Sequence, residues 1–144
     1  MPTTRRRKSQ PFSLRLSPQV LEEIQTVARL LERPSSFLVT RLIEEGLKQR
    51  RCPGILFTDG PAGRRATVAG TGIDVWEVIR VWQGSDKDLD AVARALPQLS
   101  RRQLESALHY YRSYPAEIDE RLAREAAAEA DLAHRVPLVR RYPG

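Results

Sequence analysis

The sequence predicts a mainly α protein. We expect a dimeric N-terminal unit of one strand plus two helices, a small β-hairpin with a helix-turn-helix-like domain, and a C-terminal helix with a tail. Residues 11–17 alternate in polarity, three long stretches repeat apolar residues at helical spacing, and glycine and proline separate them. The expected parts are a basic flexible arm (1–10), the strand–helix–helix unit (11–50), a linker (51–54), a helical domain (55–115), a C-terminal helix (116–134) and a basic tail (135–144).

Composition and charge exclude several classes of protein. The chain has 144 residues, a formal net charge of +6, one cysteine and two histidines. No run of about 20 apolar residues could span a membrane, and no apolar run follows the basic N-terminus as a secretory signal requires. One cysteine and two histidines form neither an intramolecular disulfide nor a Cys/His zinc cluster, and no catalytic triad has the required spacing. We therefore expect a cytoplasmic protein that is not an enzyme and binds no cofactor, metal or membrane.

A short strand opens the first unit. Phe12, Leu14 and Leu16 alternate with polar residues, as in a half-buried strand. A lone strand leaves its backbone groups unpaired, and about 40 residues bury too little apolar surface by themselves. We therefore expect a homodimer, in which two strands pair as an antiparallel ribbon and four helices cover its apolar face.

Two helices follow the strand. Ser17 and Pro18 suit the N-cap and the first helical position, and Glu22 and Glu23 are expected in the first turn. The stretch 32–34 ends this helix, and Ser35 is the predicted cap of a second helix that frays near residue 50. The apolar stripes are Leu21, Ile24, Val27, Ala28 and Leu31 in the first helix, and Leu38, Leu42, Ile43 and Leu47 in the second.

The opposite face of such a ribbon suits operator DNA. Arg15 can bind guanine O6 and N7 in the major groove of double-stranded DNA, and Ser13 can contact either base of a pair. The start of the second helix, at Ser35 and Ser36, offers N–H groups to a backbone phosphate. The arm adds four basic residues without an acid, which suit a polyanion, and these are Arg5, Arg6, Arg7 and Lys8.

The stretch PFSLRLSPQVLEEIQTVARLLERPSSFLVTRLIEEGL resembles the ribbon-helix-helix (CopG/ParD-like) family of dimeric repressors and antitoxins. The resemblance implies that strand residues 11, 13 and 15 bind DNA. Pro11 departs from the polar base-reading residue that is more usual there. The alternative is that residues 11–50 form a dimer and do not bind DNA.

A small hairpin is predicted after residue 50. The runs 55–57 and 65–68 are apolar or β-branched and flank a stretch rich in turn residues. Cys52 lies in the predicted linker, where we interpret it as an incidental thiol. The glycines between residues 60 and 72 match no nucleotide-binding loop, so no small-molecule substrate is expected.

Three helices complete this domain. Asp74 is the predicted cap of a helix over 75–83, Ser85 with Asp88 predicts a capping box before a helix over 86–96, and Ser100 caps a helix over 101–113. The residues expected to face inward are Val75, Ile79, Trp82, Leu89, Val92, Ala93, Leu96, Leu104, Ala107, Leu108 and Tyr111. The outward face of the last helix is either a solvated surface, which Glu105 favours, or a second surface for DNA or a partner, and its residues are Arg101, Arg102, His109 and Arg112.

Residues 53–120 are similar to a bacterial family of unknown function, DUF433, found in VapB-like antitoxins. The similarity rests on the strand pair, on VAGTGIDVWEVIRVWQG and ALPQLSRRQLESALHYY, and on the segment 115–118. Family members usually carry an arginine where this chain has Gly72. The resemblance implies a helical fold and a pairing with a PIN-like ribonuclease toxin.

The C-terminal segment combines a helix and an extended tail. Residues 116–134 have high helix propensity but a thin apolar stripe of Ile118, Leu122 and alanines, so we expect the helix to gain little by packing on its own domain. The tail can fold on a partner. We expect Arg140 or Arg141 to reach the acidic active site of the toxin, where a guanidinium competes with the metal. The side chains expected to fill surface pockets are Val136, Leu138, Val139 and Tyr142.

These patterns favour an antitoxin of a type II toxin–antitoxin system, nucleoid-associated, that binds its operator as a dimer and neutralises its cognate toxin. Two alternatives stay open. One is a stand-alone dimeric transcriptional regulator without a toxin. The other is a module for dimerisation or protein interaction that does not bind DNA.

Overall fold

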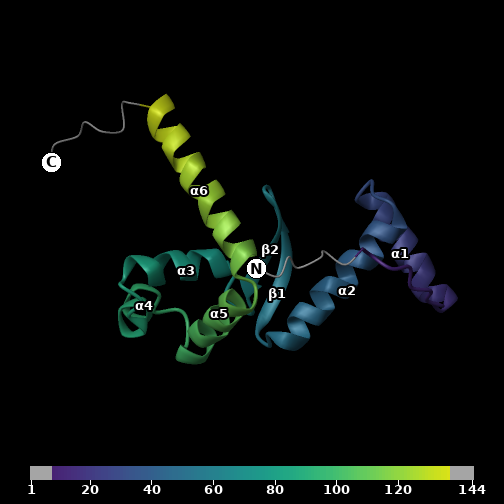
Figure 1. The fold of residues 1–144 in the computed structure, drawn as a ribbon, viewed down its shortest axis with the longest axis horizontal. Coiled ribbons are helices and arrows are strands. Elements are labelled where there is room, and N and C mark those ends of the chain that lie inside the picture. The colour runs from purple at the N-terminus through teal and green to yellow at the C-terminus, as the bar shows by residue number, and fades with distance from the viewer. Residues whose placement is uncertain (1–7, 137–144) are drawn as a thin grey trace. The chain divides into compact units, whose positions relative to one another are not determined.

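The computed structural model describes residues 8–136, which contain six helices and a two-stranded antiparallel sheet (Figure 1). The mainly helical class is therefore confirmed. None of the described helices has both the length and the apolar character needed to cross a membrane. The elements are α1 (Pro18–Leu30), α2 (Ser35–Arg51), β1 (Ile55–Gly60), β2 (Gly63–Val68), α3 (Val75–Gly84), α4 (Leu89–Ala95), α5 (Arg101–Ser113) and α6 (Pro115–Arg135).

The chain divides into two compact units, Met1–Glu44 and Glu45–Gly144. The boundary lies inside α2, whereas the sequence predicted a linker at 51–54. Residues of that predicted linker belong to the second unit, because Cys52 is fully buried in its core. The thiol is therefore enclosed by apolar side chains, which is a correction to its expected place in an open loop.

The helix starts of the first unit follow local sequence signals. The Ser17 side chain accepts a hydrogen bond from the Val20 backbone N–H (3.3 Å), and Pro18 is the first residue of α1, as predicted. The first turn of α1 contains no acidic residue, so the prediction for Glu22 and Glu23 is wrong by about one turn. Ser35 is the first residue of α2 instead of its cap, a shift of one position.

The first unit has a very small core. Its buried apolar residues within the described part are Ile24, Ala28 and Leu38, against which Leu16 and Val39 pack. Residues 11–17 belong to neither strand of the sheet and run without regular secondary structure into the Ser17 cap. The predicted ribbon requires a second copy of the chain, so it stays a prediction.

The two strands of the predicted hairpin form the sheet of the second unit, and both strands are longer than the apolar runs in the sequence indicated. β1 and β2 pair from Ile55 with Val68 to Gly60 with Gly63, and residues 61–62 connect them. Gly63 has a φ of +102°, a backbone region that favours glycine. Ile55 and Val68 are buried, so this pair faces the core.

Two of the three predicted caps after the hairpin are correct. Asp74 precedes α3 and Ser100 caps α5, with the Ser100 hydroxyl accepting from the Gln103 N–H (3.1 Å). Ser85 does not cap α4. Asp88 does so instead, since its carboxylate accepts from the Asp90 N–H (3.0 Å). Residues 86 and 87 both have positive φ values, so the chain turns there before the helix can start.

The core of the second unit joins the hairpin, α3, α4, α5 and the start of α6. The predicted inward residues Trp82, Leu89, Ala93, Leu96 and Tyr111 pack against it while partly buried. Tyr110 is fully buried, although the sequence pattern pointed to its neighbour Tyr111. The buried members of this core include Cys52, Ile55, Val68, Val75, Val78, Ile79, Val92, Leu104, Ala107, Leu108, Tyr110 and Ile118.

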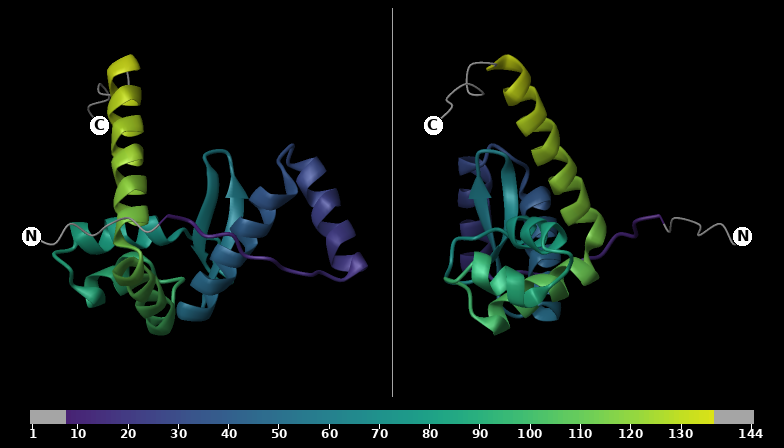
Figure 2. Two further views of the ribbon diagram at one scale, coloured as in Figure 1. Left: turned by 45° about the vertical axis from the view of Figure 1, so that its right-hand side comes forward. Right: turned by 90° about the vertical axis from the view of Figure 1, so that its left-hand side faces the viewer.

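The last described helix, α6, packs on its own unit with its first turns and projects beyond it with its second half (Figure 2). Ile118 is buried, Arg121 lies over the Trp76 ring (5.6 Å to its centroid), and Glu129 pairs with Arg80. α6 therefore contacts its own unit through polar and cation–π contacts as well as through Ile118, which the thin apolar stripe did not predict. Leu132, by contrast, is 64% exposed.

Candidate nucleic-acid and partner interfaces

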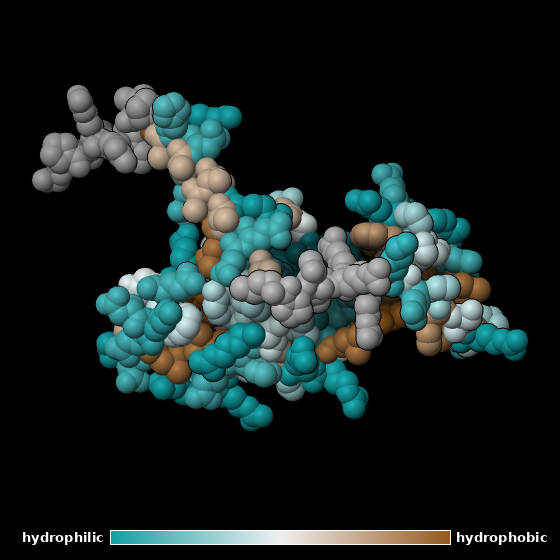
Figure 3. Space-filling model, in the orientation of Figure 1, coloured by the Kyte–Doolittle hydropathy of each residue, from teal (hydrophilic) through white to brown (hydrophobic). Residues whose placement is uncertain are grey.

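An exposed apolar face dominates the first unit, and part of it is visible in Figure 3. Two grooves mark this face. One of about 360 Å³ is lined by residues of α1 and α2, and one of about 210 Å³ also includes Leu14 and Leu16 from the segment before α1. Leu42 lines both grooves. The exposed large apolar side chains of the unit are Phe12, Leu14, Val20, Leu21, Val27, Leu30, Leu31, Phe37, Leu42 and Ile43.

The residues predicted to read bases are accessible. Ser13 and Arg15 are exposed, as is Lys8 of the basic arm, and neither Arg15 nor Lys8 forms an ion pair with any residue in the range 8–136. Phe12 is 85% exposed, so the apolar side of the same segment is equally open. The predictions for Arg5, Arg6 and Arg7 lie outside the described residues.

The start of α2 carries more positive charge than the sequence analysis found. Ser36 is exposed and Ser35 is half-buried, at a helix start whose first N–H groups lack intrahelical acceptors. The guanidinium groups of Arg33 and Arg41 lie over the Phe37 ring, 5.0 Å and 4.8 Å from its centroid. Their positions flanking Phe37 at i−4 and i+4 are the signal that could have revealed this cluster, which lies beside the predicted phosphate contact.

The second predicted surface, on α5, is only partly available to a ligand. Arg102, His109 and Arg112 are exposed, as predicted. Arg101 instead pairs with Asp90 of α4 (2.7 Å) and lies 3.7 Å from Glu105. His109 Nε2 donates to the carbonyl oxygen of Arg51 (3.1 Å). Two of the four residues are therefore engaged within the unit.

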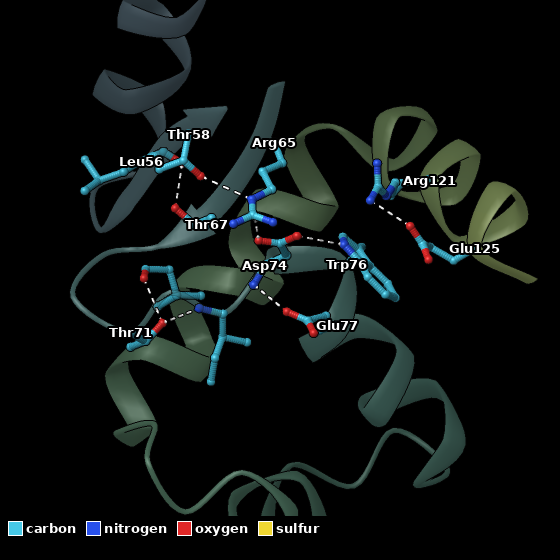
Figure 4. Close-up of polar contacts among 12 residues, drawn as sticks. Leu56, Thr58, Arg65, Thr67, Thr71, Asp74, Trp76, Glu77, Arg121 and Glu125 are labelled. Atoms are coloured by element: carbon cyan, nitrogen blue, oxygen red, sulfur yellow. Dashed lines mark hydrogen bonds and ion pairs between the residues drawn. The ribbon is translucent and has the colours of Figure 1, made fainter. Parts of the chain in front are cut away.

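A buried carboxylate organises the junction of β2 and α3 (Figure 4). Asp74 is 4% exposed, and its Oδ2 accepts a hydrogen bond from the Trp76 indole N–H (3.0 Å). Its Oδ1 lies 3.3 Å from Arg65 Nε and accepts no hydrogen bond from the described residues. The Asp74 backbone N–H donates to the carboxylate of Glu77 (2.8 Å), which lies in the first turn of α3. The network fixes Arg65 and Trp76 relative to each other.

Two more carboxylates anchor the C-terminal part of α2 in the second unit. Glu45 accepts two hydrogen bonds from Arg64 of β2 (2.6 and 3.1 Å), and this pairing raises the pKa of Arg64. Glu117 of α6 accepts from the Tyr110 hydroxyl (2.6 Å) and lies 3.3 Å from Lys48 Nζ. Burial, reinforced by the bond to Glu117, raises the pKa of Tyr110 well above its ordinary value. These contacts join the end of α2 to β2, α5 and α6 within the second unit.

The predicted toxin contacts fall at the end of the described chain. Val136 follows α6 and is 40% exposed. Leu138, Val139, Arg140, Arg141 and Tyr142 lie outside the described residues. Among residues 8–136 no group of three or more His, Cys, Asp or Glu side chains is placed to hold a metal ion.

Residues 55–111 match the model of a family described as "Protein of unknown function (DUF433)". The DUF433 part of the resemblance is therefore confirmed for the hairpin, α3, α4 and most of α5. The ribbon-helix-helix resemblance of the first unit stays a prediction. No curated protein and no solved structure matches the chain significantly.

Proposed function

We propose that the protein is a dimeric DNA-binding antitoxin, which represses its own operon through the first unit and neutralises a PIN-like ribonuclease toxin through its C-terminal end. The observation that carries the proposal is the exposed apolar face of α1 and α2. Its side chains follow one another at helical spacing, and they surround a core whose buried apolar residues, within the described part of the unit, are Ile24, Ala28 and Leu38.

A second copy of the chain is the occupant that best fits this face. Burial of apolar surface is the main driving force of folding, and residues 8–44, with three buried apolar residues, gain too little of it alone. Phe12 and Leu14 precede α1 with their side chains exposed, so the same segment of a second chain can pair with them along the backbone. Pairing would cover the grooves around Leu42 in both copies at once.

Charge supports DNA as the ligand of the paired units. Residues 1–50 hold ten basic and five acidic residues, and Lys8, Ser13 and Arg15, which precede α1, are all exposed. Arg33 and Arg41 add two guanidinium groups at the start of α2. A paired ribbon would then offer Arg15 to base edges while the helix starts meet phosphates.

The toxin is the partner expected from the family resemblance. The end of α6 supports this assignment, because exposed Leu132, and Val136 directly after the helix, give a partner apolar surface next to the predicted tail contacts.

Binding to a DNA fragment from the protein's own promoter tests the regulatory part. Fluorescence anisotropy with the promoter fragment and with a scrambled duplex should show preference for the former. Arg15→Ala should weaken specific binding by about 1–3 kcal/mol and relax specificity. Arg94→Ala, a change of an exposed arginine on α4, is the matched control. Equal loss on both duplexes would refute base reading, and no binding to either would favour the protein-interaction module.

Co-expression with the product of the adjacent gene tests the antitoxin part. We expect the two proteins to co-elute in size-exclusion chromatography and the ribonuclease to be inhibited. A chain ending at residue 133, and the full chain with Arg140→Ala and Arg141→Ala, should lose affinity. Unchanged affinity of both variants would remove the tail from the interface. Specific DNA binding without any complex would favour the stand-alone regulator.

A further inference from the structure

A pocket of about 250 Å³ lies between β2, α3 and α6 of the second unit. No part of the proposed function uses it. Most of its polar lining is basic, and the two elements that face each other across it each contribute two arginines. The polar and aromatic lining residues are Arg64 and Arg65 of β2, Arg121 and Arg124 of α6, Trp76 and Glu117.

The two arginines of β2 differ in how many of their N–H groups have an acceptor. Arg64 donates through Nε and Nη2 to Glu45, and its Nη1 lies 3.3 Å from Asp59. Arg65 makes its contacts with Thr58 and with Asp74 through Nε, each at 3.3 Å. The two terminal nitrogens of Arg65 therefore have no hydrogen-bond partner in the range 8–136, although a guanidinium carries five N–H donors.

The arginines of α6 have unfilled donors as well. Arg121 pairs with Glu125 through Nη2 (2.7 Å), but its Nε is buried and has no hydrogen-bond partner among the described residues. A buried donor without an acceptor is costly, and it is uncommon in folded proteins. Arg124 is exposed and forms no ion pair within the described part of the chain.

The carboxylates near the pocket are already engaged. Glu117, which lines it, accepts from Tyr110 and lies 3.3 Å from Lys48. Asp74, which is not part of the lining, accepts the Trp76 indole N–H through Oδ2; its Oδ1 accepts no hydrogen bond from the described residues but lies 3.3 Å from Arg65 Nε. Among the residues that line the pocket, the N–H groups without an acceptor in the described part of the chain therefore belong to Arg65 on one wall and to Arg121 and Arg124 on the other.

We infer that this pocket binds an oxyanion of the phosphate type. Such a group has acceptors only, carries the charge that guanidinium groups prefer, and can meet donors from two walls at once because its oxygens are tetrahedral. A carboxylate is planar, so it would accept hydrogen bonds from the arginines of one wall more readily than from those of both walls. The ligand is either free phosphate or a phosphate group of a nucleic acid.

Titration of the ¹⁵N-labelled full chain with inorganic phosphate at constant ionic strength tests the inference. The Trp76 indole N–H and the Arg121 Nε–H resonances should shift and saturate. Arg124→Gln should weaken phosphate binding at least tenfold, and it changes an exposed side chain without ion-pair partners in the described residues, so the fold should persist. Arg94→Gln, an equal loss of charge on α4, should leave the titration unchanged.

Three results would overturn the inference. These are a linear response without saturation, an equal effect of Arg94→Gln and Arg124→Gln, and saturation by acetate at lower concentration than by phosphate. A short DNA duplex added to the phosphate-saturated sample identifies the source. Displacement of the bound phosphate, seen at the Trp76 and Arg121 resonances, supports the site with DNA as its ligand, and unchanged Trp76 and Arg121 resonances support it with free phosphate.

Discussion

Truncation of Leu42 tests the dimer most directly. Leu42 lies on α2 and lines both apolar grooves of the first unit, so a partner seated on this face must contact it. Leu42→Ala removes three carbons, and because alanine has the highest helix propensity, α2 should be retained. We expect the variant to stay folded and to dissociate at higher concentration than the wild type.

The size of this effect follows from the exposure of the side chain. Full burial of three methylene-sized groups is worth about 2.4 kcal/mol. Leu42 is 48% exposed in the single chain, so about half of that, or about 1.2 kcal/mol, is available to a partner. A symmetric dimer contains the change twice, which gives about 2.4 kcal/mol and a dimer dissociation constant raised about fifty-fold.

Sedimentation equilibrium over a range of concentrations measures the dissociation constant, and circular dichroism reports whether the helices persist. Leu132→Ala is the matched control, because it removes the same atoms from an exposed leucine of α6. The reasoning is refuted if the wild type is a monomer at micromolar concentration with a cooperative unfolding transition, or if both leucine variants weaken the dimer equally.

Three further predictions concern single side chains. Lys8→Ala should weaken binding to promoter and scrambled DNA alike and reduce the slope of log K against log salt, measured by anisotropy; a loss confined to the promoter would contradict a phosphate contact. Tyr110 stays neutral in the fold, since its pKa is raised above the ordinary value of 10.0, whereas it ionises on unfolding above that pH. Stability should therefore fall as the pH rises through about 10, and Tyr110→Phe should flatten this fall by up to about 1.4 kcal/mol per pH unit in urea titrations; an unchanged slope would show that Tyr110 contributes nothing to it. Asp74→Asn should lower the free energy of unfolding by about 1–3 kcal/mol because Arg65 loses its buried counter-charge, whereas the control Asp59→Asn on the exposed hairpin should change it by less than about 0.5 kcal/mol in thermal unfolding.

Local signals predicted most of the elements. Serine or aspartate before an apolar helical stripe marked the starts of α1, α3 and α5, because a cap depends on the four or five residues around it. The same reasoning failed at Ser85, since positive φ values at 86 and 87 place the start of α4 later.

Features that depend on distant residues were not predictable in the same way. Cys52 follows a helix end and precedes proline, a pattern typical of a loop, yet the hairpin and α5 enclose it. Arg101 was interpreted as a candidate ligand contact, but Asp90 of another helix neutralises it. The pocket between β2 and α6 is lined by residues more than 50 positions apart in the sequence, and no spacing in the sequence predicts it.

The position of the unit boundary inside α2 decides how the protein can be dissected. A fragment beginning at residue 51 would lack Glu45 and Lys48, so Arg64 would keep only its contact with Asp59 and Glu117 would lose its ion pair. A fragment beginning a few residues before Glu45 keeps both anchors and sheds only the apolar segments of the first unit. Experiments that assign an activity to one unit should use the fragment that begins before Glu45. Loss of activity in the fragment that begins at residue 51 would report damage to the hairpin and not the absence of an activity.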